Sequence, residues 1–492
     1  MDVVPSDPVA ALLAEARRLH ACGAGDDDVH AAYLAVLQRD PTRLDALLEF
    51  GRALMAAGRR AAARVAFSQA VEHHPDVAAA QVMLGLAQLE SGEPGPARER
   101  FECALRIDPG DALAHTGLSF CLEQLGESEA AAGHRRLGFA GRALIRKAYR
   151  GTGTAVPILL LASANGGNVP LERHLDERVF ETTIVVPEFL DAGTPLPPHR
   201  LVVNAIGDVD AVPDALRAAR AFCERTAQPI LNVPSAVAAT GRCDAVRRYG
   251  DIPGVVVPRA VLLPRAALSD GAAAEALRSA GLAYPLLMRS PGHHTGMHFE
   301  RIDGPAALAP ALQRLPGDAL IAIEYVETRS PDGRWRKYRA MTIAGRLLPL
   351  HLAVSGQWKV HYFSAAMADS QEYRAEEARF LEAMPEVLGA DAMRALAAIQ
   401  RRMGLDYGGI DFAIGSGGEV VLFEANATMI VAPADADPRW DYRRAAVARV
   451  DEAVRAMLLR RADLEPRAAT VGHAILAVDG VAPARTAEGV AG

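Results

Sequence analysis

A spacing of 34 residues governs the first 140 residues of this chain. Glycine permits the turn between two helices, and proline marks the start of the next unit. Because one helix pair cannot bury its apolar face alone, the spacing predicts a stack in which each pair contacts its neighbours. Six turn-forming residues recur at this interval: Pro41, Pro75, Pro109, Gly58, Gly92 and Gly126.

The repeat resembles the tetratricopeptide repeat, which has the same period. Residues 100–109, Arg-Phe-Glu-Cys-Ala-Leu-Arg-Ile-Asp-Pro, are similar to the last helix and exit turn of such a unit. The resemblance implies about three repeats in an all-α helical-repeat domain over residues 1–148, with a concave groove that binds a protein or peptide partner. Docking of the stack onto the remaining chain, or dimerisation through it, is the alternative.

Charge and apolar patterning exclude two classes of partner. The 492-residue chain has a net charge of −7, and its basic residues are scattered among acidic ones, so no basic field for nucleic acid is expected. No run of 18 uncharged apolar residues occurs, and the first residues lack a leader pattern. We expect a cytoplasmic protein of about three domains without a membrane partner. Its five cysteines are an odd number without close spacing, which disfavours disulfides and zinc.

Residues 151–155, Gly-Thr-Gly-Thr-Ala, are predicted as a short hinge. Apolar strand-like runs follow at 156–162, 182–187 and 201–206, and helical patterns lie between and after them, notably at 214–226. This alternation predicts βαβ units and a small parallel sheet.

We assign these elements to an α/β domain over residues 155–250. The loop after its first strand, residues 163–168, is placed to meet a ligand at the carboxyl end of the sheet.

The strongest indication of an active site in the sequence is a predicted hairpin near the C-terminal end, within residues 405–426. The glycine-rich segment 415–418 separates two alternating apolar runs. A two-residue loop would pair Asp411 with Leu422 and place Asp411, Glu424 and Asn426 on one face, whereas a loop one residue longer would separate them. Two carboxylates and an amide are hard oxygen donors, so the three are predicted ligands of Mg²⁺ or Mn²⁺.

This hairpin is similar to the last motif of the ATP-grasp superfamily, an Asp followed thirteen residues later by Glu-x-Asn. Residues 284–297 resemble the family's strand and phosphate loop, and residues 323–326 resemble the hinge whose backbone holds adenine. The resemblance covers residues 155–460. It implies an α/β preliminary domain and an α+β ATP-grasp nucleotide-binding and catalytic domain over 251–462. The Ala-, Gly- and Pro-rich end of the chain predicts a flexible tail over 463–492, with a short strand at 471–478 as the alternative.

The same resemblance implies roles for residues upstream of the metal ligands. Two arginines stand where the family carries lysines, and arginine neutralises phosphate with a rigid bidentate fork. Lys359 and His361 are expected on one face of a strand, where they orient the acceptor or stabilise phosphate; a solvated strand edge is the alternative. The implied nucleotide-binding residues are Arg242, Arg289, Gly292, Gly296, Glu324, Val326 and Lys337, and the implied catalytic residues are Arg339, Lys359 and His361.

We therefore expect ATP- and Mg²⁺-dependent ligation of a carboxylate to an amine, with release of ADP. The γ-phosphoryl group would move to the carboxylate, and the amine would displace phosphate from the acyl phosphate. A peptide or natural-product intermediate recruited by the repeats is one candidate substrate. Two alternatives are an ATP-grasp kinase that phosphorylates a small-molecule hydroxyl and a nucleotide-binding scaffold without turnover.

Overall fold

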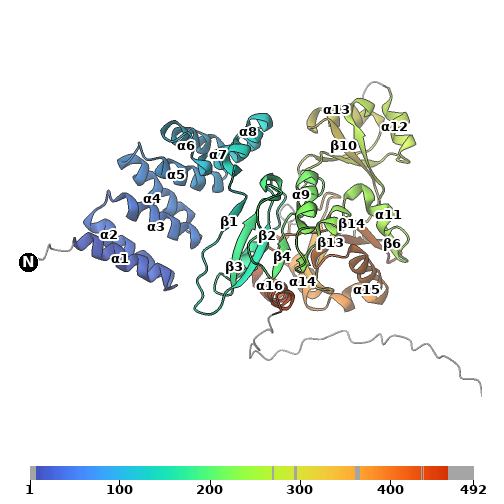
Figure 1. The fold of residues 1–492 in the computed structure, drawn as a ribbon. Helices are drawn as coiled ribbons and strands as arrows, with labels where there is room; N and C mark the ends of the chain where they lie inside the picture. The colour runs from blue at the N-terminus through green and yellow to red at the C-terminus, as the bar shows by residue number, and fades with distance from the viewer. Residues whose placement is uncertain are drawn as a thin grey trace, which may run out of the picture.

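The computed structural model describes residues 7–268, 271–292, 296–360, 366–433, 435 and 437–463. Figure 1 shows a stack of helices at the N-terminal end and, beside it, β-sheets with helices packed around them. The predicted tail lies outside the described residues, apart from Asp463. Within the described ranges, no helix is both long enough and apolar enough to cross a membrane.

The N-terminal stack consists of helix pairs, which confirms the prediction that the 34-residue repeat forms them. Gly58, Gly92 and Gly126 follow the first helix of a pair with φ of 73°, 76° and 82°, a left-handed conformation that glycine adopts without strain. Phe67 is fully buried against Gly51, where a Cβ atom would lie 2.2 Å from its ring. The pairs are α1 (Pro8–Ala21) with α2 (Asp26–Arg39), α3 (Leu44–Ala56) with α4 (Arg60–His73), α5 (Ala78–Glu90) with α6 (Pro94–Ile107), and α7 (Ala112–Gln124) with α8 (Ser128–Phe139).

The first sheet has the strand order β1-β3-β2-β4-β5. Strands β3, β2, β4 and β5 are parallel, as predicted, whereas β1 is antiparallel to β3. Strand β1 was not predicted, and it joins the end of the repeat stack to this sheet. The elements are β1 (Leu144–Arg146), β2 (Val156–Leu161), η1 (Leu171–His174), β3 (Phe180–Val185), η2 (Pro187–Phe189), β4 (Leu201–Asn204), α9 (Pro213–Cys223), β5 (Ile230–Leu231) and α10 (Pro234–Ala238).

The second sheet is antiparallel, with the order β7-β10-β8-β9. Its buried face packs against two helices around Leu286 and Met288 of β8, which are fully buried. The elements are β7 (Ala260–Pro264), η4 (Arg265–Leu268), α12 (Ala273–Ser279), β8 (Leu286–Arg289), β9 (Phe299–Ile302), α13 (Pro305–Arg314) and β10 (Ala319–Glu324).

The third sheet, with the order β12-β11-β13-β14-β6, shares a buried core with the first sheet and with α16. Ile158 of β2, Met341 of β11 and Val454 of α16 belong to that core. The elements are η3 (Arg242–Asp244), α11 (Ala245–Tyr249), β6 (Val255–Val256), β11 (Trp335–Ile343), β12 (Arg346–Ser355), α14 (Gln371–Glu382), α15 (Met384–Met403), β13 (Tyr407–Ile414), β14 (Val420–Asn426), η5 (Pro438–Trp440) and α16 (Asp441–Arg461).

Candidate active site

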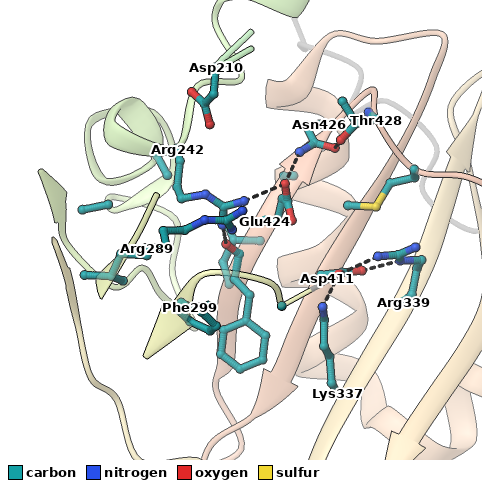
Figure 2. Close-up of a pocket in the computed structure, with 18 of the residues that line it drawn as sticks. Asp210, Arg242, Arg289, Phe299, Lys337, Arg339, Asp411, Glu424, Asn426 and Thr428 are labelled. Atoms are coloured by element: carbon teal, nitrogen blue, oxygen red, sulfur yellow. Dashed lines mark hydrogen bonds and ion pairs between the residues drawn. The ribbon is translucent and has the colours of Figure 1, made fainter. Parts of the chain in front are cut away.

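A cavity of about 810 Å³ is lined by the second and third sheets and by loops at the carboxyl end of the first sheet. Figure 2 shows its charged centre, with Arg242 and Arg289 facing the hairpin of β13 and β14. His361 lies outside the described residues. Every other predicted site residue lines the cavity: Arg242, Arg289, Gly292, Gly296, Glu324, Val326, Lys337, Arg339, Lys359, Asp411, Glu424 and Asn426.

The predicted hairpin register is wrong, yet the three oxygen-bearing residues remain together. Phe412, and not Asp411, pairs with Leu422, so the loop is longer than two residues. That longer loop alone would have moved Glu424 to the other face. A β-bulge compensates, because the register shifts after Phe412 and Asp411 pairs with Glu424. The extra loop residue and the extra bulge residue thus cancel.

A row of ionisable side chains crosses the third sheet at this level. His351 of β12 pairs with Arg339 of β11, Arg339 pairs with Asp411 of β13, and Asp411 pairs with Glu424 of β14. Directly opposed residues in a sheet hold their side chains close together on one face. The strand pairing itself therefore assembles the charged row.

Asp411 is fully buried and is neutralised by two cations. Arg339 donates from Nε to Oδ1 at 2.6 Å and from Nη2 to Oδ2 at 2.8 Å, and Nζ of Lys337 lies 2.6 Å from Oδ2. Burial alone raises the pKa of Asp411, but the charges of Arg339 and Lys337 outweigh burial and hold the pKa well below its usual range. Asp411 is thus an anion at every physiological pH.

Glu424 shares one of its oxygens between two donors. Oε1 accepts from Nη2 of Arg242 at 2.8 Å and from Nδ2 of Asn426 at 2.5 Å. Oδ1 of Asn426 accepts from the N–H and the hydroxyl of Thr428 at 3.0 and 2.8 Å. Burial raises the pKa of Glu424, and the charge of Arg242 more than reverses this, so the pKa is lowered. No described residue donates a hydrogen bond to Oε2 of Glu424.

The donor set can accept a divalent cation, provided that negative charge arrives with it. Among the described lining residues, seven are Lys or Arg and five are Asp or Glu. Both oxygens of Asp411 already face cations, and the described residues contain no group of three His, Cys, Asp or Glu placed to hold a metal. Oε2 of Glu424 and the amide of Asn426 are hard donors suited to magnesium. The net positive charge of the lining repels a bare cation. It attracts a metal–polyphosphate complex, because the phosphates make that complex negative.

Arg289 and Lys359 stand where the second sheet meets the third. Burial, and next the charge of Arg242, lower the pKa of Arg289 to about 10, so the guanidinium stays protonated at neutral pH. It lies 5.9 Å from the ring of Phe299. Lys359 donates from Nζ to the Phe299 carbonyl at 3.1 Å and lies against Gly296, which has a φ of 74°. Lys359 therefore links the loop after β12 to the loop between β8 and β9.

The strand predicted around Lys359 is absent from the described part of that segment. Strand β12 ends at Ser355, and residues 356–360 are irregular, with the N–H of Val360 bonded to the Trp358 carbonyl at 3.0 Å. Strand β12 lies at the edge of its sheet, so no neighbouring strand extends its pairing. A shared face by period-two alternation requires a strand, and none runs through Lys359; His361, the other residue of the predicted pair, lies outside the described residues.

Besides Arg242, which pairs with Glu424, two more of the predicted nucleotide-binding side chains contact the protein itself. Glu324 ends β10, and its Oε2 accepts the N–H of Arg259 at 3.1 Å. Lys337 contacts Asp411, as described above. The backbone N–H of Glu324 is also engaged, since it donates to the Arg259 carbonyl at 2.8 Å, and Val326 lines the cavity beyond the end of β10.

The sequence reasoning missed several lining residues. Asp208 and Asp210 follow β4, and acids at the carboxyl end of a parallel strand were a usable signal. His351 and Arg443 had no local signal, because His351 faces the site only through its pairing with Arg339 and Arg443 comes from the distant helix α16.

Comparisons with known proteins identify the repeats. The family model of the tetratricopeptide repeat matches residues 48–112 and 83–134. A structure of MamA from Desulfovibrio magneticus covers 26% of this chain and 72% of its own, with 22% identity and a TM-score of 0.24. A structure of D-alanyl-alanine synthetase A from Vibrio cholerae covers 63% of this chain and 100% of its own, with 16% identity and a TM-score of 0.40. No curated protein matches the chain. The N-terminal region thus carries tetratricopeptide repeats.

Proposed function

We propose that the cavity is the active site of an ATP- and magnesium-dependent ligase that joins a carboxylate to an amine and forms ADP. The observation that carries the proposal is the pairing of Asp411 with Glu424, beside Asn426, in a cavity that also contains Arg242 and Arg289. Hard oxygen donors next to guanidinium groups suit a nucleotide polyphosphate with its metal. The motif resemblance to ATP-grasp ligases supports the same reaction class.

The side chains divide the work of phosphoryl transfer. A divalent cation, magnesium or manganese, held by Asp411, Glu424 and Asn426 would supply positive charge at the transferred phosphoryl group. Arg242 and Arg289 bind phosphate oxygens with their charged N–H groups. Arg339 and Lys337 act differently in this scheme, since both neutralise Asp411 and hold it in place.

The nucleotide and the reactive intermediate are held by loops. The backbone around Glu324 and Val326 would hold adenine, and the N–H groups of Gly292 and Gly296 would bind phosphate. The contact of Lys359 with Phe299 lies at one edge of the cavity, and the loops that it joins would exclude water when a nucleotide is bound. Excluding water at this edge protects an acyl phosphate from hydrolysis.

The repeats would supply a protein or peptide to this site. We propose a repeat domain over residues 1–148, a preliminary α/β domain over 155–250 and a catalytic domain over 251–462. Phe139 of α8 stacks on Phe189 of η2, with ring centroids 5.3 Å apart, and packs with Ala164 of the loop after β2. That loop lines the cavity at Asn165. The end of the stack, which would bind the partner, therefore contacts a loop that lines the cavity.

Magnesium-dependent release of ADP from ATP tests the function. The purified full chain is mixed with a pool of amino acids, small carboxylates and peptides, beside Glu424→Ala and the exposed control Glu452→Ala. We expect ADP formation that requires a member of the pool. In Glu424→Ala the rate of ADP formation should fall about 100-fold, as for removal of one preorganised charge-stabilising group. The control should match the wild-type rate. A stable phosphorylated product without an amine would instead identify a kinase. Tight nucleotide binding without turnover would favour a scaffold, and AMP would contradict the acyl-phosphate route.

A further inference from the structure

Four of the five carboxylates that line the cavity are engaged by the protein. Such charge-assisted or backbone hydrogen bonds fix a carboxylate and use part of its acceptor capacity, whereas a carboxylate without a protein partner keeps all of it for a substrate group. The engaged four are Asp411 with Arg339 and Lys337, Glu424 with Arg242, Glu324 with the N–H of Arg259, and Asp208 with the N–H groups of Asp210 and Ala211.

The fifth carboxylate, Asp210, accepts no hydrogen bond and makes no ion pair with any described residue. Its backbone is nevertheless fixed, because Oδ1 of Asp208 accepts the N–H of Asp210 at 3.0 Å and the Asp208 N–H donates to the Gly167 carbonyl at 3.1 Å. Asp210 lines the cavity and keeps exposed surface there, and Figure 2 shows its carboxylate on the side of the cavity where Arg242 lies. It is thus a positioned anion available to a ligand.

The chemistry of that ligand follows from the charge of Asp210. A phosphate or carboxylate group is repelled by it, and a single carboxylate is a poor site for a magnesium ion. An ammonium group is a compact cation with N–H donors that one carboxylate can accept. The amine that the ligase reaction requires is such a group at neutral pH.

We propose that Asp210 binds the ammonium group of a primary-amine substrate and accepts its proton before the C–N bond forms. The proposal rests on the proposed ligase function. The carboxylate of Asp210 takes one proton from R–NH₃⁺, and the freed lone pair of R–NH₂ attacks the carbonyl carbon of the acyl phosphate. The C–N bond forms, and the bond between the carbonyl carbon and the oxygen that bridges to phosphorus breaks. Phosphate leaves with the electron pair of the broken bond and takes the second proton of the amine. The products are the amide and hydrogen phosphate.

The surroundings suit a proton acceptor. The cavity walls displace solvent from around the Asp210 carboxylate, which raises its pKa; the charge of Arg242 opposes that rise, and Asp208 and Glu424 add to it. A raised pKa makes a carboxylate a stronger base. The charged or titratable groups that face Asp210 are Asp208 on its own loop, Arg242 and Cys243 of η3, Arg289 of β8 and Glu424 of β14.

Hydroxylamine measures formation of the acyl phosphate, the first half of the reaction, independently of the role proposed for Asp210 in the second half. It is uncharged near neutral pH, so it traps an acyl phosphate as a hydroxamate without a base. We would compare the wild-type chain, Asp210→Asn and Asp214→Asn, an exposed control on α9, with ATP, magnesium and the twenty common amino acids and their dipeptides, with and without hydroxylamine.

In Asp210→Asn we expect amide formation to fall about 100-fold, in the range for loss of a general base. Hydroxamate formation should stay within about 3-fold of wild type, and amide formation should recover as rising pH deprotonates the amine. The Asp214→Asn control should match wild type in both assays. Loss of hydroxamate with amide, or unchanged amide formation, in Asp210→Asn would overturn the role of Asp210. A wild-type chain that forms neither product would overturn the ligase function itself.

Discussion

The repeat stack, α1 to α8, and the cavity region, which comprises the three sheets and their helices from β1 to α16, place their charges in opposite ways. In the stack, Ala, Leu and Phe side chains fill the core, and pairs such as Arg17–Glu49 lie near the surface. In the cavity region, Asp411 is fully buried and is held by Arg339, 72 residues away in sequence. The stack therefore depends on packing between neighbours, whereas the cavity depends on ion pairs that only the complete fold assembles.

The largest effect should come from removing one partner of the buried ion pair. Arg339→Met leaves Asp411 with Lys337 alone, and we expect the free energy of unfolding of the cavity region to fall by about 3 kcal/mol. All three tryptophans, Trp335, Trp358 and Trp440, lie in this region, so denaturation followed by their fluorescence reports on it selectively.

The matched control is Arg17→Met in the stack, where the exposed pair with Glu49 should contribute at most about 1 kcal/mol. Circular dichroism at the helical band follows the stack. Equal losses in the two variants would remove the distinction between the regions.

Nucleotide binding should stabilise the cavity region and leave the stack unchanged. At a Mg-ATP concentration of about 100 times Kd, we expect a gain of about 2.7 kcal/mol in the tryptophan-detected transition. Magnesium alone at the same concentration should give no gain, because the lining residues carry net positive charge. A comparable shift with the bare ion would show that Asp411 and Glu424 bind metal without phosphate.

Acid should weaken the cavity region before it protonates most carboxylates. Burial lowers the pKa of His174 to about 4, below the ordinary 6.5. The unfolded chain then binds a proton that the folded chain excludes, so this contribution is present above pH 6.5, declines as the pH falls and is lost near pH 4. We expect a loss on the order of 2 kcal/mol. His174→Gln should flatten the pH dependence of tryptophan-detected unfolding, and an unchanged slope would argue against a buried neutral His174.

The smallest effects should distinguish two glycines within the stack. At Gly51 a Cβ atom meets the Phe67 ring at 2.2 Å, so Gly51→Ala should cost about 1 to 2 kcal/mol through overpacking. At Gly133 in α8 a Cβ atom meets nothing within 4 Å, so Gly133→Ala should stabilise by about 0.5 kcal/mol through helix propensity. Thermal unfolding followed by circular dichroism measures both changes. The same sign at both positions would show that local packing does not set the stability of the stack.

The predictions from sequence succeeded where the signal is local. The glycines at 58, 92 and 126 predicted helix pairs, and the apolar runs near 156 and 201 predicted parallel strands. They failed at the hairpin register, because glycine-rich turns permit several loop lengths and a bulge leaves no mark in the alternation. They failed again at Lys359, since an apolar alternation does not show whether a neighbouring strand is present.

The sequence by itself determined the repeat period, the order of the regions and the three oxygen-bearing residues of the hairpin. Only the tertiary structure decided which cations meet them, because Arg242 reaches Glu424 across 182 positions of the chain. It alone also showed that Asp210, in the same cavity, has no partner among the residues that the structure describes. Periodicity is set by bonds to near neighbours, whereas the pairing of buried charges depends on how distant segments pack.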